Sequence, residues 1–315
     1  MGTDLNLKSS DVEVSMNLYE FRLSLTGACN HDCIYCGPFS DGKYVQGYGN
    51  LSPHQLDEIT LLMKKHPLHV QLTGGEPSLR KDLELIVKNL TENGIGNIGM
   101  TTNCSKLNEK RALELYLAGL KDIHIHVPSL DEGVYSATVR RPSGQVISNI
   151  IAVAALAKEA GVRVEFNTPV TKVNLQTLPD LMDFCYGRKI NLKLIEEVNV
   201  NEDQIRFDDI KRLIGGWLDT KGISNLSTSL PQRYGSIYNF SDELFFRIAP
   251  ATPGLAAHLR GEKLKPFFDG RFWIGGSKGD YMFTPSCFIN PLSGDYSDLE
   301  RNLNTTINIY SEAGK

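Results

Sequence analysis

Short apolar runs alternate with amphipathic stretches along the first two-thirds of the chain. The apolar runs have the length of β-strands and cover residues 20–26, 68–73, 97–102, 122–127, 162–168 and 190–196. Stretches with helical spacing lie between them, at residues 53–65, 80–93, 107–118, 145–160 and 175–186. Strands that alternate with helices are typical of a parallel sheet built from βα units. The pattern therefore predicts an α/β fold, a partial (β/α)6 barrel of the TIM-like kind.

The regular spacing weakens after about residue 200. Residues 203–218 are predicted to form a helix, and strand-like pieces follow near 244–249, 271–275 and 280–284. We expect an N-terminal arm over residues 1–16 and the barrel over 17–200. Residues 201–315 are expected to form a C-terminal extension that covers the open side of the barrel and shapes the substrate pocket.

Composition narrows the class of protein. The 315 residues suffice for one large core, and a net charge of −4 with a pI near 6.0 argues against a protein that coats nucleic acid. No apolar run is long enough to span a bilayer, and no signal-peptide segment is evident. Six cysteines in a chain of this length do not make a disulfide framework, so we expect a reducing, cytoplasmic setting.

Three of those cysteines form a compact motif directly after the first predicted strand. Cys29, Cys33 and Cys36 have the spacing C-x3-C-x2-C. Three thiolates in one loop suit a soft metal or an iron–sulfur cluster, and a [4Fe–4S] cluster held by three cysteines keeps one iron open to a small molecule. The alternatives are a zinc site or three unrelated thiols. Structural zinc usually takes four ligands from two pairs, and the sequence has no second pair.

Further polar groups follow the other predicted strands. They are Gly74-Gly75-Glu76-Pro77, Thr102 with Asn103, His126, Asn167 with Thr168, and Glu196 with Glu197. The carboxyl ends of parallel barrel strands share one face, which carries the active site. The sequence therefore predicts that these groups and the cysteine loop meet on one rim.

Their chemistry supports several roles. Gly74 and Gly75 let backbone approach a ligand closely, and Glu76 can accept from an ammonium group, although a tight βα turn explains the same residues. Thr102 and Asn103 offer a hydroxyl and an amide, or else cap a turn. His124 and His126 fall on one strand face, with His126 nearer the rim, so His126 is a candidate catalytic and cofactor-binding residue; a structural histidine is the alternative.

Arginines add possible anion contacts. The flanking Phe21 and Leu23 place Arg22 on the inward face of the first strand, where an unpaired charge is costly, so we expect it to contact a substrate or cofactor anion. Arg140 and Arg141 either clamp an anionic group or are solvated charges at a helix start.

Three motifs, in order and spacing, resemble the radical SAM superfamily. The stretches Arg22 to Asn30, Leu72 to Pro77 with Leu79 to Leu83, and Thr101 to Asn103 resemble in particular the molybdenum-cofactor GTP 3',8-cyclases, and the likeness covers residues 20–200. The resemblance implies one [4Fe–4S] cluster on Cys29, Cys33 and Cys36, with S-adenosylmethionine on its open iron. Reductive cleavage of this cofactor gives a 5'-deoxyadenosyl radical that abstracts hydrogen from a substrate.

The same resemblance assigns residues to the cofactor. It places Gly74, Gly75, Glu76 and Pro77 at the methionine amino group, Thr102 and Asn103 near the methionine or ribose, and Tyr35 beside the adenine. Asn167 and Glu196 match polar strand-end positions, and Arg22 matches an arginine that approaches the triphosphate.

Two departures from the cyclases concern the substrate. In the cyclases the fourth strand ends in a Ser-Leu-Asp stretch, whereas here His126 comes before that stretch. The C-x2-C-x13-C motif that binds a second cluster in the cyclases is missing from this chain, since Cys287 is the only cysteine after residue 185. We therefore expect a single cluster and a substrate other than GTP. Residues 271–273 and 275–278 lie in the matching zone and are expected to line the pocket. Cys104, Cys185 and Cys287 are interpreted as ordinary buried thiols.

These observations favour an enzyme of lyase or oxidoreductase type that acts on a small polar molecule. We expect a nucleotide, nucleoside or sugar-linked biosynthetic intermediate, with hydrogen abstraction followed by cyclisation, elimination, decarboxylation or oxidation. The electron donor would be a flavodoxin or ferredoxin, with neither a nucleic acid polymer nor a membrane as partner. A peptide-modifying enzyme and a non-catalytic cluster-binding protein are the alternatives.

Overall fold

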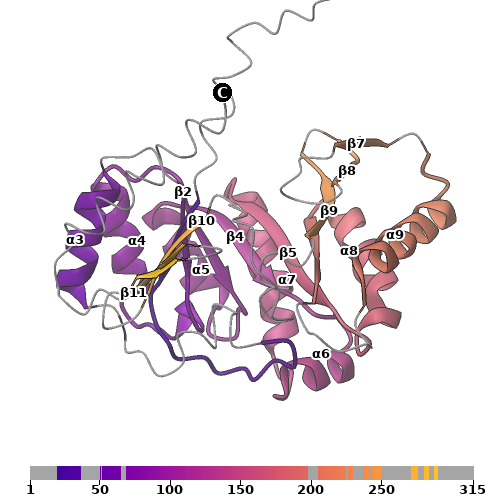
Figure 1. Ribbon diagram of the computed structural model, residues 1–315, viewed down its shortest axis with the longest axis horizontal. Helices are drawn as coiled ribbons and strands as arrows, with labels where there is room; N and C mark the ends of the chain where they lie inside the picture. Colours follow the sequence, from indigo (N-terminus) through magenta and orange to yellow (C-terminus); the bar gives the residue numbers. More distant parts are fainter. Residues whose placement is uncertain are drawn as a thin grey trace, which may run out of the picture.

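The fold is described from a computed structural model (Figure 1). The structure describes residues 20–36, 50, 52–64, 69–197, 205–224, 226–229, 237–241, 243–249, 271–275, 280–283 and 287–289. The arm predicted over residues 1–16 lies outside these ranges.

A parallel sheet forms the centre of the protein. Among the described residues it has eight strands, in the order β10 (Arg271–Gly275), β1 (Glu20–Ser24), β2 (His69–Thr73), β3 (Ile98–Thr102), β4 (Leu120–His126), β5 (Arg163–Val170), β6 (Asn191–Glu196) and β9 (Phe245–Ala249). The six strands predicted from the apolar runs are all present. The α/β class and the partial barrel are confirmed, because neighbouring strands pair in parallel and the sheet does not close on itself in the described part.

The C-terminal region adds strands at both edges of this sheet. β10 pairs in parallel with β1, and β9 pairs in parallel with β6, so the predicted strands near 271–275 and 244–249 are confirmed. Short antiparallel strands continue the sheet outward, with β11 (Asp280–Phe283) and β12 (Cys287–Ile289) beside β10, and β8 (Ile237–Asn239) and β7 (Ser227–Ser229) beside β9. The boundary near residue 200 stays a prediction.

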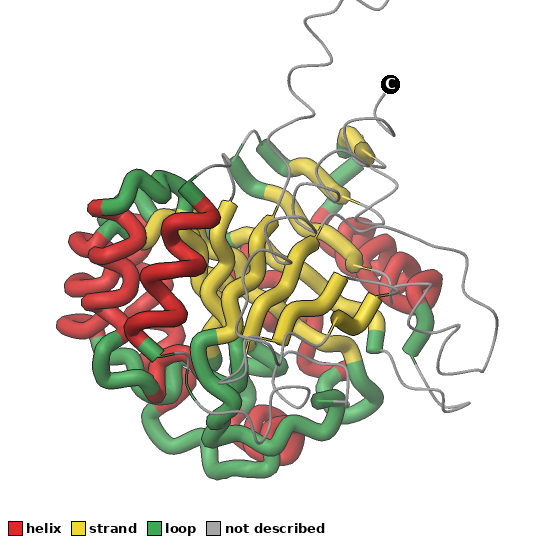
Figure 2. Tube along the Cα trace, turned by 60° about the vertical axis from the view of Figure 1, so that its left-hand side comes forward, coloured by secondary structure: helices red, strands yellow, loops and turns green. Residues whose placement is uncertain are grey.

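Most of the helices cover the outer face of the curved sheet, as Figure 2 shows, and α6 (Glu132–Val139) lies beside the cysteine loop. The helices are α3 (Pro53–Met63), α4 (Leu83–Glu92), α5 (Glu109–Ala118), α6, α7 (Val146–Glu159), α8 (Leu178–Arg188) and α9 (Phe207–Lys221), with short 3-10 turns η1 (Pro77–Leu79) and η2 (Leu175–Thr177). The sequence did not predict α6, which is short and contains Gly133. Asp131 begins it by accepting a hydrogen bond from the Val134 N–H at 2.8 Å.

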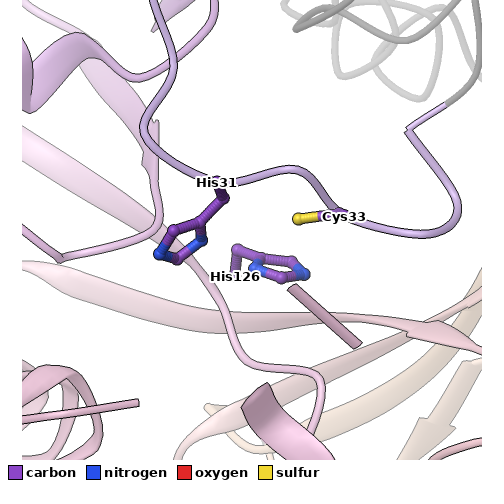
Figure 3. Close-up of side chains that lie close together, drawn as sticks. All are labelled: His31, Cys33 and His126. Atoms are coloured by element: carbon purple, nitrogen blue, oxygen red, sulfur yellow. The ribbon is translucent and has the colours of Figure 1, made fainter. Parts of the chain in front are cut away.

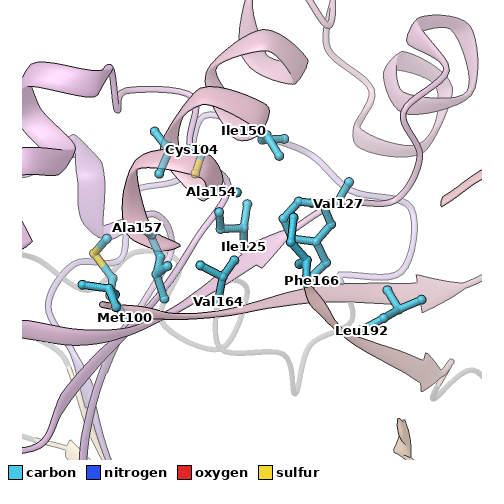
Figure 4. Packing of buried hydrophobic residues seen from close by; sticks show 14 of the residues in the cluster. Met100, Cys104, Ile125, Val127, Ile150, Ala154, Ala157, Val164, Phe166 and Leu192 are labelled. Atoms are coloured by element: carbon cyan, nitrogen blue, oxygen red, sulfur yellow. The ribbon is translucent and has the colours of Figure 1, made fainter. Parts of the chain in front are cut away.

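The core lies between the sheet and these helices. Strand side chains such as Leu72, Met100, Ile125 and Phe166 are fully buried there, and Figure 4 shows strand residues of this cluster packed against α7. Successive strand residues point to opposite faces, so the residues between them face the interior of the barrel. By this alternation Arg22, the neighbour of the buried Leu23, falls on the interior face.

An aromatic cluster joins the C-terminal region to the core. Phe246 of β9 is fully buried, with ring centroids 4.8 Å from Phe240 and 5.5 Å from Trp217 of α9. The β9 strand is therefore part of the barrel core and not a loose attachment.

We expect Phe246→Ala to lower the free energy of unfolding by about 3–5 kcal/mol, because it removes a buried ring and leaves a cavity. Urea unfolding followed by circular dichroism checks this value. The neighbouring Phe245→Ala is the control, since Phe245 is only half-buried, and it should cost clearly less. Equal effects of the two substitutions would contradict the assignment of β9 to the core.

Candidate functional site

The polar motifs lie at the carboxyl ends of neighbouring parallel strands. The cysteine loop follows β1, residues 74–77 follow β2, Asn103 follows β3, and His126 ends β4. Because these strands run side by side in the same direction, their ends form one rim. The predicted convergence of the motifs on one face of the sheet is thus present.

The cysteine loop is tied to the end of α6. Asp32 N–H donates to Val139 O and Ile34 N–H donates to Thr138 O, both at 3.0 Å. A further bond of 3.0 Å from Cys36 N–H to Cys33 O forms a turn between the last two cysteines. The unpredicted helix therefore fixes the path of the loop between its thiols.

The three thiols suit an iron–sulfur cluster. Cys29 is exposed, and Cys33 and Cys36 are half-buried. Burial raises the pKa of Cys33, and the neighbouring Cys36 and Cys29 raise it further, so the three sulfurs lie close enough to interact. Burial likewise raises the pKa of Cys29 to about 11. A cationic metal centre would deprotonate such thiols and relieve their mutual repulsion, and three soft thiolates at one place fit a [4Fe–4S] cluster.

The glycines after β2 are required by the cysteine loop itself. Gly75 N–H donates to Thr26 O at 2.7 Å, and Glu76 N–H donates to Ala28 O at 2.8 Å. A Cβ atom would lie 2.4 Å from Thr26 O at Gly74 and 2.1 Å from Ala28 O at Gly75. Gly74 also has φ +135°, a conformation that favours glycine. The close approach seen here is between two segments of the chain, and contact of these glycines with a cofactor stays a prediction.

Glu76 joins the ends of β2 and β3. Its carboxylate is 2% exposed and accepts from Ser78 N–H at 2.9 Å, Thr102 Oγ1 at 2.6 Å and Asn103 N–H at 2.6 Å. Burial raises the pKa of Glu76, while the donors of Ser78, Thr102 and Asn103 act in the opposite direction. Three of the predicted cofactor residues therefore meet, but the side-chain oxygens of Glu76 already bind protein donors. Pro77 begins the short turn η1 that presents Ser78.

Asn103 continues this connection into the cysteine motif. Its side-chain Nδ2 donates to Asn30 Oδ1 at 3.1 Å, and Asn30 Nδ2 donates to Ser105 Oγ at 2.8 Å. Asn30 directly follows Cys29, so a hydrogen-bonded chain runs from Glu76 through Asn103 to the first cysteine.

Arg80 supports the same rim and was not assigned a role from the sequence. It is 5% exposed, donates to the carbonyl of Leu25 at 2.9 Å, and pairs with Asp82 at 2.7 Å. Leu25 lies between β1 and the cysteine loop, so Arg80 holds the strand end that leads into the motif. The sequence feature that could have indicated this role is the position of Arg80 shortly after a predicted strand.

Tyr35 and His126, both predicted site residues, are in contact. The Tyr35 hydroxyl forms a hydrogen bond with His126 Nε2. Burial, together with the nearby His31, lowers the pKa of His126 to about 3, so its imidazole is neutral near pH 7. Figure 3 shows His31, Cys33 and His126 gathered at this place. The sequence reasoning missed His31, although its position between Cys29 and Cys33 could have singled it out.

His124 lies deeper on the same interior face. Its Nε2 is 3.4 Å from Asp122 and 3.9 Å from Glu165, which in turn pairs with Arg247 of β9 at 2.5 Å. Burial raises the pKa of Glu165, but Arg247, His124 and Lys193 outweigh it and lower the pKa overall. His124 thus belongs to an ionic network inside the barrel and not to the rim.

The remaining candidates are spread over the interior and the surface. Asn167 pairs in register with His126 and is 9% exposed, and its Oδ1 has no hydrogen-bond partner among the described residues. Arg22 is half-buried on β1. Glu196 accepts from the Phe207 N–H at 3.2 Å, which gives it a place at the start of α9.

Arg140 and Arg141 do not begin a helix. Arg140 follows the last residue of α6 with φ +53°, and its side chain, 57% exposed, lies 3.7 Å from Asp32. Arg141 is exposed and donates to Arg140 O at 3.3 Å.

Cys104 and Cys185 are buried free thiols, as predicted, and Cys287 begins β12. Arg271, Phe272 and Trp273 belong to β10, and residues 276–278 lie outside the described ranges.

Comparison with known proteins agrees with this geometry. The family model of the Radical SAM superfamily matches residues 23–185. A probable GTP 3',8-cyclase of Methanococcus aeolicus is 31% identical over 198 residues, which cover 61% of this chain and 64% of that protein. One of Thermoplasma volcanium is 32% identical over 193 residues, covering 60% of this chain and 57% of the relative. The chain thus spans roughly 60% of the length of these relatives.

Solved structures share the fold. Streptococcus suis SuiB bound to S-adenosylmethionine has a TM-score of 0.61 at 16% identity and covers 92% of this chain and 68% of its own. SuiB bound to its precursor peptide SuiA has a TM-score of 0.61 at 15% identity, covering 95% and 72%. At this identity the likeness concerns the fold alone. In the described part of the chain, no helix has the length and apolar character needed to cross a membrane.

We expect Gly75→Ala to displace the cysteine loop, because the new Cβ meets the backbone oxygen of Ala28 at 2.1 Å. The free energy of unfolding should fall by about 1–3 kcal/mol, and the protein should retain less iron after reconstitution. Urea unfolding and iron analysis measure the two effects. Gly187→Ala in α8 is the control, since its Cβ would meet nothing within 4 Å; similar losses in both variants would contradict the account.

Proposed function

Since this chain belongs to the radical SAM superfamily, we propose that it is a radical enzyme that abstracts a hydrogen atom from a small polar substrate. Members of the superfamily use a [4Fe–4S] cluster and S-adenosylmethionine. When bound, these groups supply a 5'-deoxyadenosyl radical through one-electron cleavage of the sulfonium. The observation that carries the proposal is the joining of the cysteine loop to the ends of β2 and β3 by Glu76, Asn103 and Asn30.

The residues of the chain have distinct tasks in this proposal. Cys29, Cys33 and Cys36 hold the cluster, and the backbone of Gly74, Gly75 and Glu76, fixed against the cysteine loop, contacts the methionine end of the cofactor. Thr102 and Asn103 keep this segment in place. Tyr35, His126 and Asn167 border the neighbouring part of the rim, where the Asn167 Oδ1 accepts from a bound group.

The substrate pocket lies on the interior face of the sheet. Arg22, His124, Glu165 and Arg247 make this face polar and charged, which suits a substrate rich in hydrogen-bonding groups. We propose a nucleotide, nucleoside or sugar-linked molecule, with cyclisation, elimination, decarboxylation or oxidation after hydrogen abstraction. The relatives are named GTP 3',8-cyclase. Here the missing second cysteine motif argues for a substrate other than GTP and for a single cluster. The electron donor is a flavodoxin or ferredoxin.

The test is anaerobic formation of 5'-deoxyadenosine. Protein reconstituted with iron and sulfide should carry about four irons per chain. After reduction it should form 5'-deoxyadenosine from S-adenosylmethionine, and one member of a panel of nucleotides, nucleosides, sugar nucleotides and short peptides should increase the rate. Stimulation by a peptide would favour a peptide-modifying enzyme, and no product from protein with four irons would favour a cluster-binding protein without catalysis.

Cys29→Ala should abolish 5'-deoxyadenosine formation, because it removes one of three cluster ligands. Cys185→Ala is the matched control, since this buried thiol lies on α8, away from the rim. It should retain the iron and the activity. Activity that survives in Cys29→Ala would show that the ligands are wrongly assigned.

His126→Ala should keep its iron but form 5'-deoxyadenosine about tenfold more slowly. This change corresponds to an increase of about 1.4 kcal/mol in the activation free energy. The loss of a neutral, half-buried imidazole at the rim is the reason. His54→Ala, on the exposed side of α3, is the control and should leave the rate unchanged. An unchanged rate in His126→Ala would return His126 to a purely structural role.

A further inference from the structure

Two histidines accompany the second cysteine of the motif. One ligand atom each of His31, Cys33 and His126 lies within 4.8 Å of the other two (Figure 3). We propose that the protein without its cluster binds a single zinc ion between these three side chains. This site is distinct from the cluster site, which uses the three thiolates, but it shares Cys33 with it.

The spacing of the donors is close to that of a mononuclear site. Zinc binds imidazole nitrogen at about 2.0–2.1 Å and thiolate sulfur at about 2.3 Å, so tetrahedral geometry separates neighbouring donors by about 3.3–3.6 Å. The donor atoms, which lie within 4.8 Å of one another, therefore have to approach by up to about 1.5 Å to complete the site. His31 and Cys33 are half-buried residues of one short loop, so the proposal requires this approach to come from their side chains and that loop.

The ring nitrogens are arranged for binding. His31 Nδ1 is buried, and among the described residues it has no hydrogen-bond partner, which is costly for a polar atom unless a ligand satisfies it. His126 Nε2 contacts the Tyr35 hydroxyl. Metal-binding histidines usually donate their second ring N–H to such an oxygen, and the tautomer that donates from Nε2 leaves Nδ1 for the ion.

The chemical class of the ion follows from the donors. Two imidazoles and one thiolate form a borderline-soft set that suits zinc and its spectroscopic substitute cobalt, whereas magnesium and calcium prefer oxygen. Water, or the thiolate of Cys29 or Cys36, fills the fourth position. Because the Cys33 sulfur cannot serve zinc and the cluster together, bound zinc excludes the cluster, and the loading of the protein depends on the competition between the two.

The experiment titrates the full-length, reduced, cluster-free protein with Co²⁺ under anaerobic conditions, followed by displacement with Zn²⁺. We expect one ion per chain, with the absorption bands of tetrahedral cobalt bound to sulfur. His31→Ala should weaken binding about tenfold or more, and His126→Ala should do the same. His54→Ala, an exposed histidine of α3, is the control and should bind like the wild type.

A second measurement separates this site from the cluster. His31→Ala should take up about four irons on reconstitution, because its three thiolates are intact. Prior addition of one equivalent of Zn²⁺ should block iron uptake in the wild type and block it much less in His31→Ala. Equal Zn²⁺ affinity in the wild type and both histidine variants, or no stoichiometric binding at all, would overturn the proposal. The readouts are independent of 5'-deoxyadenosine, so failure of the radical chemistry would leave this result unchanged.

Discussion

The rim of the barrel depends on one buried carboxylate. Glu76 follows β2 and accepts hydrogen bonds from the turn η1 and from the end of β3, so the ends of two strands and this turn share one anchor. Hydrogen bonds to a charged group contribute about 1.5–3 kcal/mol each, and an unpaired carboxylate at this depth would be strongly destabilising. The cost of leaving Glu76 unpaired is what keeps the cysteine loop, through Asn103 and Asn30, in a defined position.

The outer face of the sheet forms the hydrophobic core, and the inner face carries the polar residues of the proposed pocket. Apolar strand residues pack against the helices and form the core, while the residues between them carry charges into the interior. The Glu165–Arg247 pair links β5 to β9, so a strand from the C-terminal region completes the network that lines the proposed pocket. A change of Arg247 would therefore alter the charge on this interior face.

The neighbourhood of Cys33 combines soft and borderline ligands in one small volume. The thiolates favour an iron–sulfur cluster, and the adjacent imidazoles of His31 and His126 favour a single ion. Tyr35 connects the two sets of ligands, since it belongs to the cysteine loop and its hydroxyl is hydrogen-bonded to His126. Because both arrangements need the Cys33 sulfur, only one of them can form at a time.

The sequence by itself determined the six parallel strands, the cysteine motif and the strand ends where polar groups would meet. These are local features, because apolar runs and spacing between cysteines are visible along the chain. Only the tertiary structure decided what the polar groups contact. Glu76 accepts from Thr102 and Asn103, and Gly75 packs against Ala28, contacts that the sequence did not show; the contact of Glu76 with a ligand stays a prediction. His31 and His126, 95 positions apart in the chain, come together because β1 and β4 end on the same rim. Such contacts depend on the register and curvature of the sheet, which no short stretch of sequence contains.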